Sequence, residues 1–73
     1  RPIFLPASLA LSAGGEREEY LRAVRGDNGV TPLASQDSAS SAALASADCL
    51  IVRPPDAPAT LKGGLVPILP IQN

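Results

Sequence analysis

The residues best suited to chemistry lie between positions 35 and 41, where serines, a glutamine and an aspartate stand directly before an alanine-rich run. If a helix begins near Ser38, its first backbone N–H groups have no partner within the helix, and its dipole adds about half a positive charge there. Such a helix start can bind an anion. The hydroxyls of Ser38, Ser40 and Ser41 would add donors, so the stretch predicts an oxyanion site in outline.

A positively charged side chain would complete this site. Arg22 and Arg25, in the preceding segment, each carry a forked set of donors that suits tetrahedral oxyanions. A simpler interpretation stays open, in which Asp37 or Ser38 only caps a helix and the two arginines are exposed on a strand. Because the formal net charge is −1, the chain has no long-range attraction for anions, and any anion site must be local.

No other group of residues forms a self-contained catalytic or metal site. The chain has no histidine, no Cys/His or Ser/His pairing and no complete glycine-rich phosphate loop. The sequence KGG at residues 62–64 indicates a turn, and the glutamates between residues 16 and 19 indicate a solvated strand edge. Two aromatic residues, Phe4 and Tyr20, are too few to stack bases, so we expect no nucleic-acid partner. We predict no catalytic and no metal-binding residue.

The composition fits one small domain with a thin core. A chain of 73 residues can form a single small domain over residues 1–73, and domains of this size bury only about 60% of their unfolded surface. Its hydrophobic content of 45% is too high for a disordered tail, while 3% aromatic residues means that Leu, Ile, Val and Ala build the core. Since the chain starts at Arg1 without a methionine, we expect a fragment of a larger protein.

The single cysteine and the lengths of the apolar runs indicate the cellular compartment of the protein. Cys49 has no partner for an internal disulfide and lies in the apolar sequence DCLIV, which predicts a buried structural thiol in a reducing compartment. No apolar run approaches the roughly 20 residues of a membrane span, and no signal peptide opens the chain. We therefore expect a cytoplasmic location without membrane contact.

Short strands account for most of the chain. Residues 3–11 are apolar with partial alternation, and Pro6 among them indicates an edge strand or a bulge. Residues 16–25 favour a strand over a competing helix because they run directly into DNG, a hairpin turn signal. The remaining strands are predicted at residues 30–34, 49–52 and 65–71.

One helix is predicted, over residues 38–47, where alanine dominates and nothing interrupts the run. With about five short strands and several prolines inside them, a flat central sheet is excluded. The predicted fold class is all-β: a small bent-ribbon barrel with one short helix.

Several motifs occur in a fixed order along the chain: REEYLRAVR, a glycine-containing turn, VTPLASQDSAS, LASADCLIVRPP and LKGGLVPILPI. In this order and spacing they resemble the C-terminal domain (domain IV) of molybdopterin molybdotransferases, the molybdenum insertases related to the E domain of gephyrin. That family carries R-x-x-[FY]-x-R, then V-x-P, then Q-G-S with further serines, then a small-residue run that ends in a strand. The resemblance extends from about Arg17 to Ile71.

The resemblance also suggests roles for residues that the physical argument selects. Arg22 falls on the arginine with which the family binds molybdate or the anionic groups of the cofactor, and Ser38 falls on the serine of Q-G-S. Asp37 departs from the family because glycine is usual there, and its carboxylate would lie beside the proposed anion. The candidate anion-binding residues are therefore Arg22, Gln36, Ser38, Ser40 and Ser41.

By resemblance, the parent enzyme is a multidomain cytoplasmic homodimer that inserts molybdate into adenylylated molybdopterin with magnesium-assisted release of AMP. This domain would be a β-clip-like barrel at the cleft between subunits, and it would position the anion rather than act as an acid or base. The catalytic carboxylates and the Mg²⁺ site would lie in other domains, so we expect the fragment alone to be inactive. The implied partners are the other domains, the second subunit and molybdopterin adenylyltransferase.

An alternative stays open at this point. The chain could be a non-catalytic β interaction module, whose apolar strands and proline-rich loop bind a protein partner without a ligand of its own. Because an isolated domain exposes an apolar surface wherever a neighbouring domain has been removed, such a surface does not distinguish the two hypotheses. An anion bound between Arg22 and Ser38 does.

Overall fold

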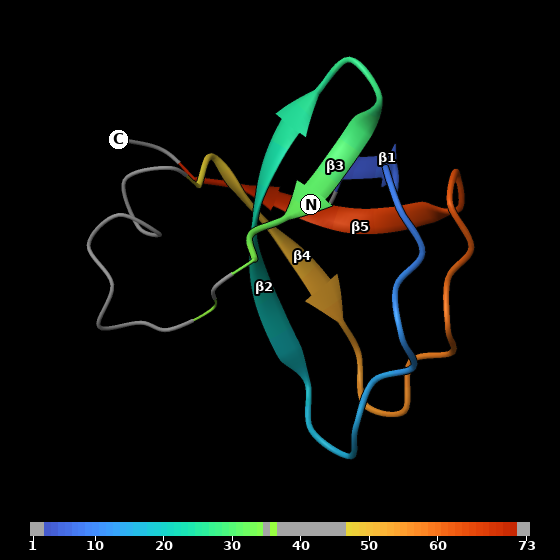
Figure 1. Ribbon diagram of the computed structural model, residues 1–73. Coiled ribbons are helices and arrows are strands. Elements are labelled where there is room, and N and C mark those ends of the chain that lie inside the picture. The colour runs from blue at the N-terminus through green and yellow to red at the C-terminus, as the bar shows by residue number, and fades with distance from the viewer. Residues whose placement is uncertain (1–2, 35, 37–46, 72–73) are drawn as a thin grey trace.

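The computed structural model describes residues 3–34, 36 and 47–71, which form a curled five-stranded antiparallel sheet (Figure 1). The order across the sheet is β1-β5-β4-β2-β3. The predicted all-β class is confirmed. Within the described residues there is no helix; the helix predicted over 38–47 lies outside them except for Ala47, which is not helical. The strands are β1 (Ile3–Pro6), β2 (Glu19–Gly26), β3 (Gly29–Pro32), β4 (Cys49–Arg53) and β5 (Leu65–Pro70).

The β2–β3 hairpin confirms the turn predicted from DNG. Gly26 pairs with Gly29 across the two-residue turn, and Gly29 adopts a positive φ of 109°, which glycine accepts most readily. Along β2, Leu21 and Ala23 face the core, and Ala23 is fully buried. The alternative helix over this segment is therefore wrong, because the segment alternates with the period of a strand.

The two edge strands meet, and this contact closes the sheet into a barrel. Ala7, directly after β1, forms a parallel bridge with Val30 of β3, and the N–H of Ser8 donates to the Val30 carbonyl at 2.9 Å. The approach at the hairpin is so close that a Cβ atom on Gly29 would lie 2.2 Å from the Pro6 carbonyl oxygen. The edge position predicted for the strand with Pro6 is confirmed, but the strand ends at Pro6 instead of continuing to residue 11.

The core lies inside the curl and contains aliphatic side chains and one thiol among the described residues. Alternate positions of β4 and β5 face inward, with Ile51 and Ile68 fully buried and paired across the two strands. This alternation is what a half-buried antiparallel sheet requires. The buried cluster is Ala7, Leu11, Ala23, Val30, Cys49, Ile51, Val66 and Ile68.

Two extended segments, residues 11–14 and 57–60, lie side by side at the end of the barrel where β4 stops. Leu11 and Thr60 exchange two backbone hydrogen bonds, of 2.8 and 2.9 Å, and the N–H of Gly14 donates to the Ala57 carbonyl. In Figure 1 these segments, blue and orange, run together away from the sheet. They form the surroundings of a buried arginine described below. No helix in the described part of the chain is long and apolar enough to cross a membrane.

Candidate anion-binding site

Arg22 lies on β2 at the point where the neighbouring strand β3 ends. The β2–β3 ladder runs from Ala23 to Gly26, so Arg22 is the first residue of β2 beyond it. The carbonyl of Arg22 accepts a hydrogen bond from the N–H of Leu33 at 2.9 Å, as the chain leaves β3. The residue is half-buried.

Gln36 binds to this free edge of β2 through its side chain. Its Oε1 accepts from the backbone N–H of Arg22 at 2.8 Å, and its Nε2 donates to the Arg22 carbonyl at 2.9 Å. The second hydrogen of Nε2 is donated to the Leu33 carbonyl, at 3.0 Å. The carboxamide thus pairs with Arg22 in the way that the backbone of an adjacent strand would.

The guanidinium of Arg22 is attached to the same residue. Its Nη1 donates to the backbone carbonyl of Gln36 at 3.0 Å, and within the described residues no carboxylate forms an ion pair with it. One hydrogen bond leaves most of the five N–H donors of a guanidinium for other acceptors. The site therefore supplies a full positive charge on an anchored side chain.

The second arginine considered from the sequence, Arg25, has a carboxylate partner. Its Nε lies 3.6 Å from Oδ1 of Asp48, and its backbone N–H donates to both oxygens of that carboxylate, at 3.0 and 3.3 Å. The two side chains are 44% and 41% exposed. Of the two arginines, Arg22 is thus the one whose charge the described residues leave uncompensated.

The structure brings together two of the five predicted site residues. Arg22 and Gln36 form one hydrogen-bonded unit, whereas Ser38, Ser40 and Ser41 lie outside the described residues. For Gln36 the geometry favours a different task from the predicted one. Both hydrogens of its Nε2 are donated to backbone carbonyls, so its carboxamide has no donor left for an anion.

A second arginine site went unnoticed in the sequence. Arg53, at the end of β4, is 5% exposed and donates three hydrogen bonds, each to a neutral acceptor. Its Nη1 bonds to the hydroxyl of Thr60 at 3.1 Å, and its Nη2 bonds to the carbonyls of Ser12, at 2.7 Å, and Pro58, at 2.9 Å. Every second residue of β4 is buried, and Arg53 follows Cys49 and Ile51 in this pattern. The alternation along the strand therefore indicates that Arg53 is buried.

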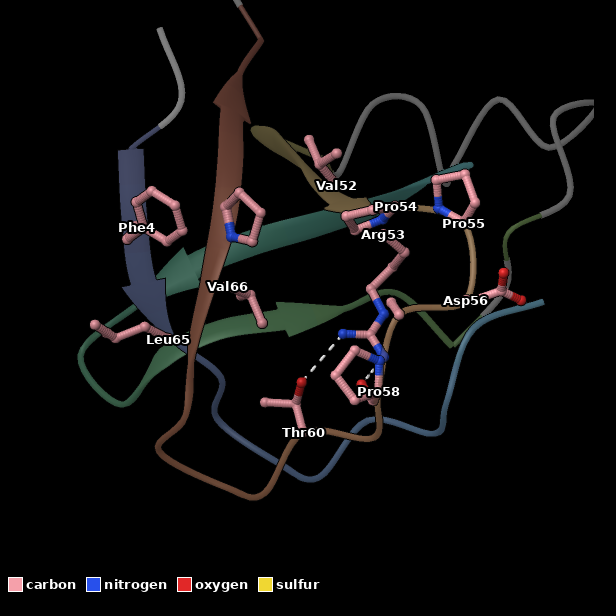
Figure 2. Close-up of a pocket in the computed structure, with 12 residues that line it drawn as sticks. Phe4, Val52, Arg53, Pro54, Pro55, Asp56, Pro58, Thr60, Leu65 and Val66 are labelled. Carbon is pink, nitrogen blue, oxygen red and sulfur yellow. Dashed lines mark hydrogen bonds between the residues drawn. The ribbon is translucent and has the colours of Figure 1, made fainter. Parts of the chain in front are cut away.

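Arg53 lies against an open hollow of about 450 Å³, shown in Figure 2. Phe4 and Leu65 border it with exposed fractions of 58% and 66%, so large apolar side chains face solvent here. Asp56 also lines the hollow and has a positive φ of 58°. The other lining residues include Val52, Val66 and the prolines at 54, 55, 58 and 67, which makes the surface mainly apolar.

Cys49 is fully buried, as predicted. Burial, together with a hydrogen bond and charge repulsion from the neighbouring Asp48, raises the pKa of the thiol from 9.0 to about 11. The thiol therefore stays protonated at neutral pH and is a poor nucleophile or metal ligand. Among the described residues, no cluster of three or more His, Cys, Asp or Glu side chains could hold a metal ion.

The family model described as the MoeA C-terminal region (domain IV) matches residues 4–71. No curated protein and no solved structure matches. The matched range includes all five strands except the first residue of β1, and it includes both arginine sites.

Proposed function

The chain belongs to the MoeA C-terminal region (domain IV) family, and on this premise we propose that it positions molybdate, or an anionic group of adenylylated molybdopterin, within a larger enzyme. Membership connects the chain with molybdenum cofactor biosynthesis. The proposal adds a specific task to that connection, which is to hold a tetrahedral oxyanion at a cleft between subunits.

The observation that carries the proposal is the anchored charge of Arg22, which forms no ion pair within the described part of the chain. Gln36 holds both its backbone and its Nη1, and no described carboxylate neutralises it. A guanidinium presents parallel N–H donors that match two oxygens of a tetrahedral anion. Because its side chain is already held in place, less conformational entropy is lost when the anion binds.

The role that fits Arg22 is electrostatic positioning rather than proton transfer. A guanidinium keeps its proton at every physiological pH, so it cannot serve as a general acid or base. A fixed positive charge can hold a substrate anion in the geometry for attack, and such positioning is a large part of catalysis. In this proposal Ser38, Ser40 and Ser41 add hydroxyl donors to the anion.

The parent enzyme in this proposal is a molybdopterin molybdotransferase. It would be a cytoplasmic homodimer that receives adenylylated molybdopterin from molybdopterin adenylyltransferase. Its catalytic carboxylates and Mg²⁺ would belong to other domains, so the 73-residue chain would bind an oxyanion without converting it. The proline-rich hollow near Phe4 and Leu65 supports contact with those domains, because an apolar surface of this kind usually has a partner.

The test is an NMR titration of the chain with molybdate, with tungstate and sulfate for comparison. We expect shifts at the backbone amides of Arg22 and Gln36 and at residues 37–41, and we expect Arg22→Ala to weaken them strongly. Arg25→Ala is the matched control, since it removes an arginine that is already paired with Asp48. Equal shifts in wild type and Arg22→Ala would refute the proposed site.

The alternative, an interaction module without a ligand, makes a different prediction for the same titration. It predicts that none of the three anions shifts any amide, whatever the variant. It also predicts that substitutions around the hollow, such as Phe4→Ser, impair binding of the neighbouring domains. The titration therefore separates the two functions without assuming either.

A further inference from the structure

Gln36 was selected from the sequence as an anion ligand, but its hydrogen bonds point to another role. We propose that Gln36 is a positioning residue, which orients the guanidinium of Arg22 for an oxyanion and does not contact that anion itself. The inference rests on the proposed function, because it assigns a role at the same site.

The first step is the saturation of the Gln36 side chain. Its Nε2 donates to the carbonyls of Arg22 and Leu33, and its Oε1 accepts from the N–H of Arg22. An oxyanion needs donors, and an amide side chain has only the two hydrogens of its nitrogen. Binding an anion through Gln36 would leave a partly buried backbone carbonyl without its donor, which is costly.

The second step is the place where Gln36 attaches. Arg22 lies just beyond the β2–β3 ladder, so its N–H would face an uncovered edge, while its carbonyl already accepts from the N–H of Leu33. The Gln36 carboxamide satisfies the N–H and gives the carbonyl a second donor, and so it replaces the missing strand at this one residue. The backbone of Arg22 is thereby fixed at the end of a ladder, where strands otherwise fray.

The third step is the hold on the guanidinium. Nη1 of Arg22 donates to the backbone carbonyl of Gln36, so one residue fixes Arg22 at its N–H, its carbonyl and its side-chain tip. With Nη1 directed toward Gln36, the Nε and Nη2 groups remain as a parallel pair, and within the described residues no acceptor is bonded to them. A pair of this kind matches two oxygens of one tetrahedral anion.

The test is a double-mutant cycle on molybdate affinity with Gln36→Met, Arg22→Ala and the double variant. Met has a similar length and removes every hydrogen bond of the carboxamide. We expect Gln36→Met to weaken binding about two- to tenfold, the cost of immobilising one long side chain on binding. In the Arg22→Ala background, we expect no further loss, because Gln36 acts only through Arg22.

Two outcomes of the cycle would overturn the proposal. If Gln36→Met weakens residual binding equally with and without Arg22, Gln36 contacts the anion directly. If Gln36→Met leaves the molybdate affinity unchanged, Gln36 does not position the Arg22 guanidinium. Should Gln36→Met fail to fold, Gln36→Asn replaces it, since Asn keeps the amide but is one methylene too short to reach both groups of Arg22.

A second readout separates failure of this inference from failure of the proposed function. Rotation of the Arg22 guanidinium about its Nε–Cζ bond, measured by side-chain nitrogen NMR without any anion, should be slow in wild type and faster in Gln36→Met. Slow rotation in wild type combined with no molybdate binding would refute the proposed function alone. Equal rotation rates in both proteins would refute the positioning role.

Discussion

Arg22 and Arg53 lie on neighbouring strands and carry the same charge, yet the barrel treats them differently. Arg53 is 5% exposed and donates three hydrogen bonds to acceptors from Ser12, Pro58 and Thr60. Arg22 is half-buried and donates one side-chain hydrogen bond, to the carbonyl of Gln36. Neither pairs with a carboxylate in the described part of the chain.

The difference shows how one side chain can serve either stability or binding. A buried guanidinium needs acceptors for its donors, and the segments around Ser12 and Thr60 supply them to Arg53. Arg53 therefore joins two extended segments to the end of β4, and few of its N–H donors remain for a ligand. Arg22 is held mainly by its backbone, so its guanidinium keeps donors for an anion.

The largest expected effect is the loss of stability in Arg53→Met. Methionine retains the apolar stem but leaves the carbonyls of Ser12 and Pro58 without donors, and we expect the free energy of unfolding to fall by about 3 kcal/mol. Urea unfolding followed by circular dichroism measures this. The graded control is Thr60→Val, which removes one of the three acceptors and should cost about 1 kcal/mol. Wild-type stability in Arg53→Met would show that the buried arginine has no structural role.

The second effect concerns a buried group that has a carboxylate, not neutral acceptors, beside it. Cys49 faces inward on β4 like Arg53, but burial and Asp48 raise the pKa of its thiol to about 11. A pKa raised above its unfolded value of 9.0 means that the native state binds the proton more tightly. The stability contributed by the protonated thiol is therefore complete below about pH 9 and lost as the pH rises through 11.

Unfolding by urea between pH 8 and pH 11 in wild type and Cys49→Ala measures this contribution. The loss of stability with pH should be steeper in wild type, by about 2 kcal/mol over the range. Parallel curves would mean that the thiol ionises in the folded protein as easily as in the unfolded chain, and that β4 tolerates a buried charge without acceptors.

The smallest stability effect is expected for Arg22→Met. Because the hydrogen bonds from Gln36 to the Arg22 backbone survive this substitution, we expect a loss of less than about 1 kcal/mol. Molybdate binding should nevertheless weaken strongly. Urea unfolding and the anion titration on the same sample give both values. A large destabilisation would place Arg22 beside Arg53 as a structural residue and remove the contrast between them.

Local patterns were sufficient to predict most of the fold. The DNG turn fixed the β2–β3 hairpin, and Pro6 correctly indicated an edge strand, because both signals act within a few residues. The end of β1 at Pro6 was missed, since it depends on the barrel closing between Ala7 and Val30. That contact joins residues far apart in the sequence, and no local pattern reports it.

The candidate site was predicted in part. The structure places two of the predicted residues, Arg22 and Gln36, together, but the role of Gln36 depends on hydrogen bonds across 14 positions of sequence. The strand predicted over residues 49–52 stops before Arg53, whereas β4 includes it. Its acceptors include Ser12, 41 positions away, so its burial could be inferred from the alternation of β4 but its partners could not.

The most direct test of the central claim observes both arginines at once in the wild-type chain. Side-chain nitrogen NMR resolves the Nε resonances of Arg22 and Arg53 during a titration with molybdate. The account predicts that the Arg22 resonance shifts and saturates while the Arg53 resonance does not move. A shift at Arg53, or no shift at Arg22 while backbone amides elsewhere respond to the anion, would contradict it.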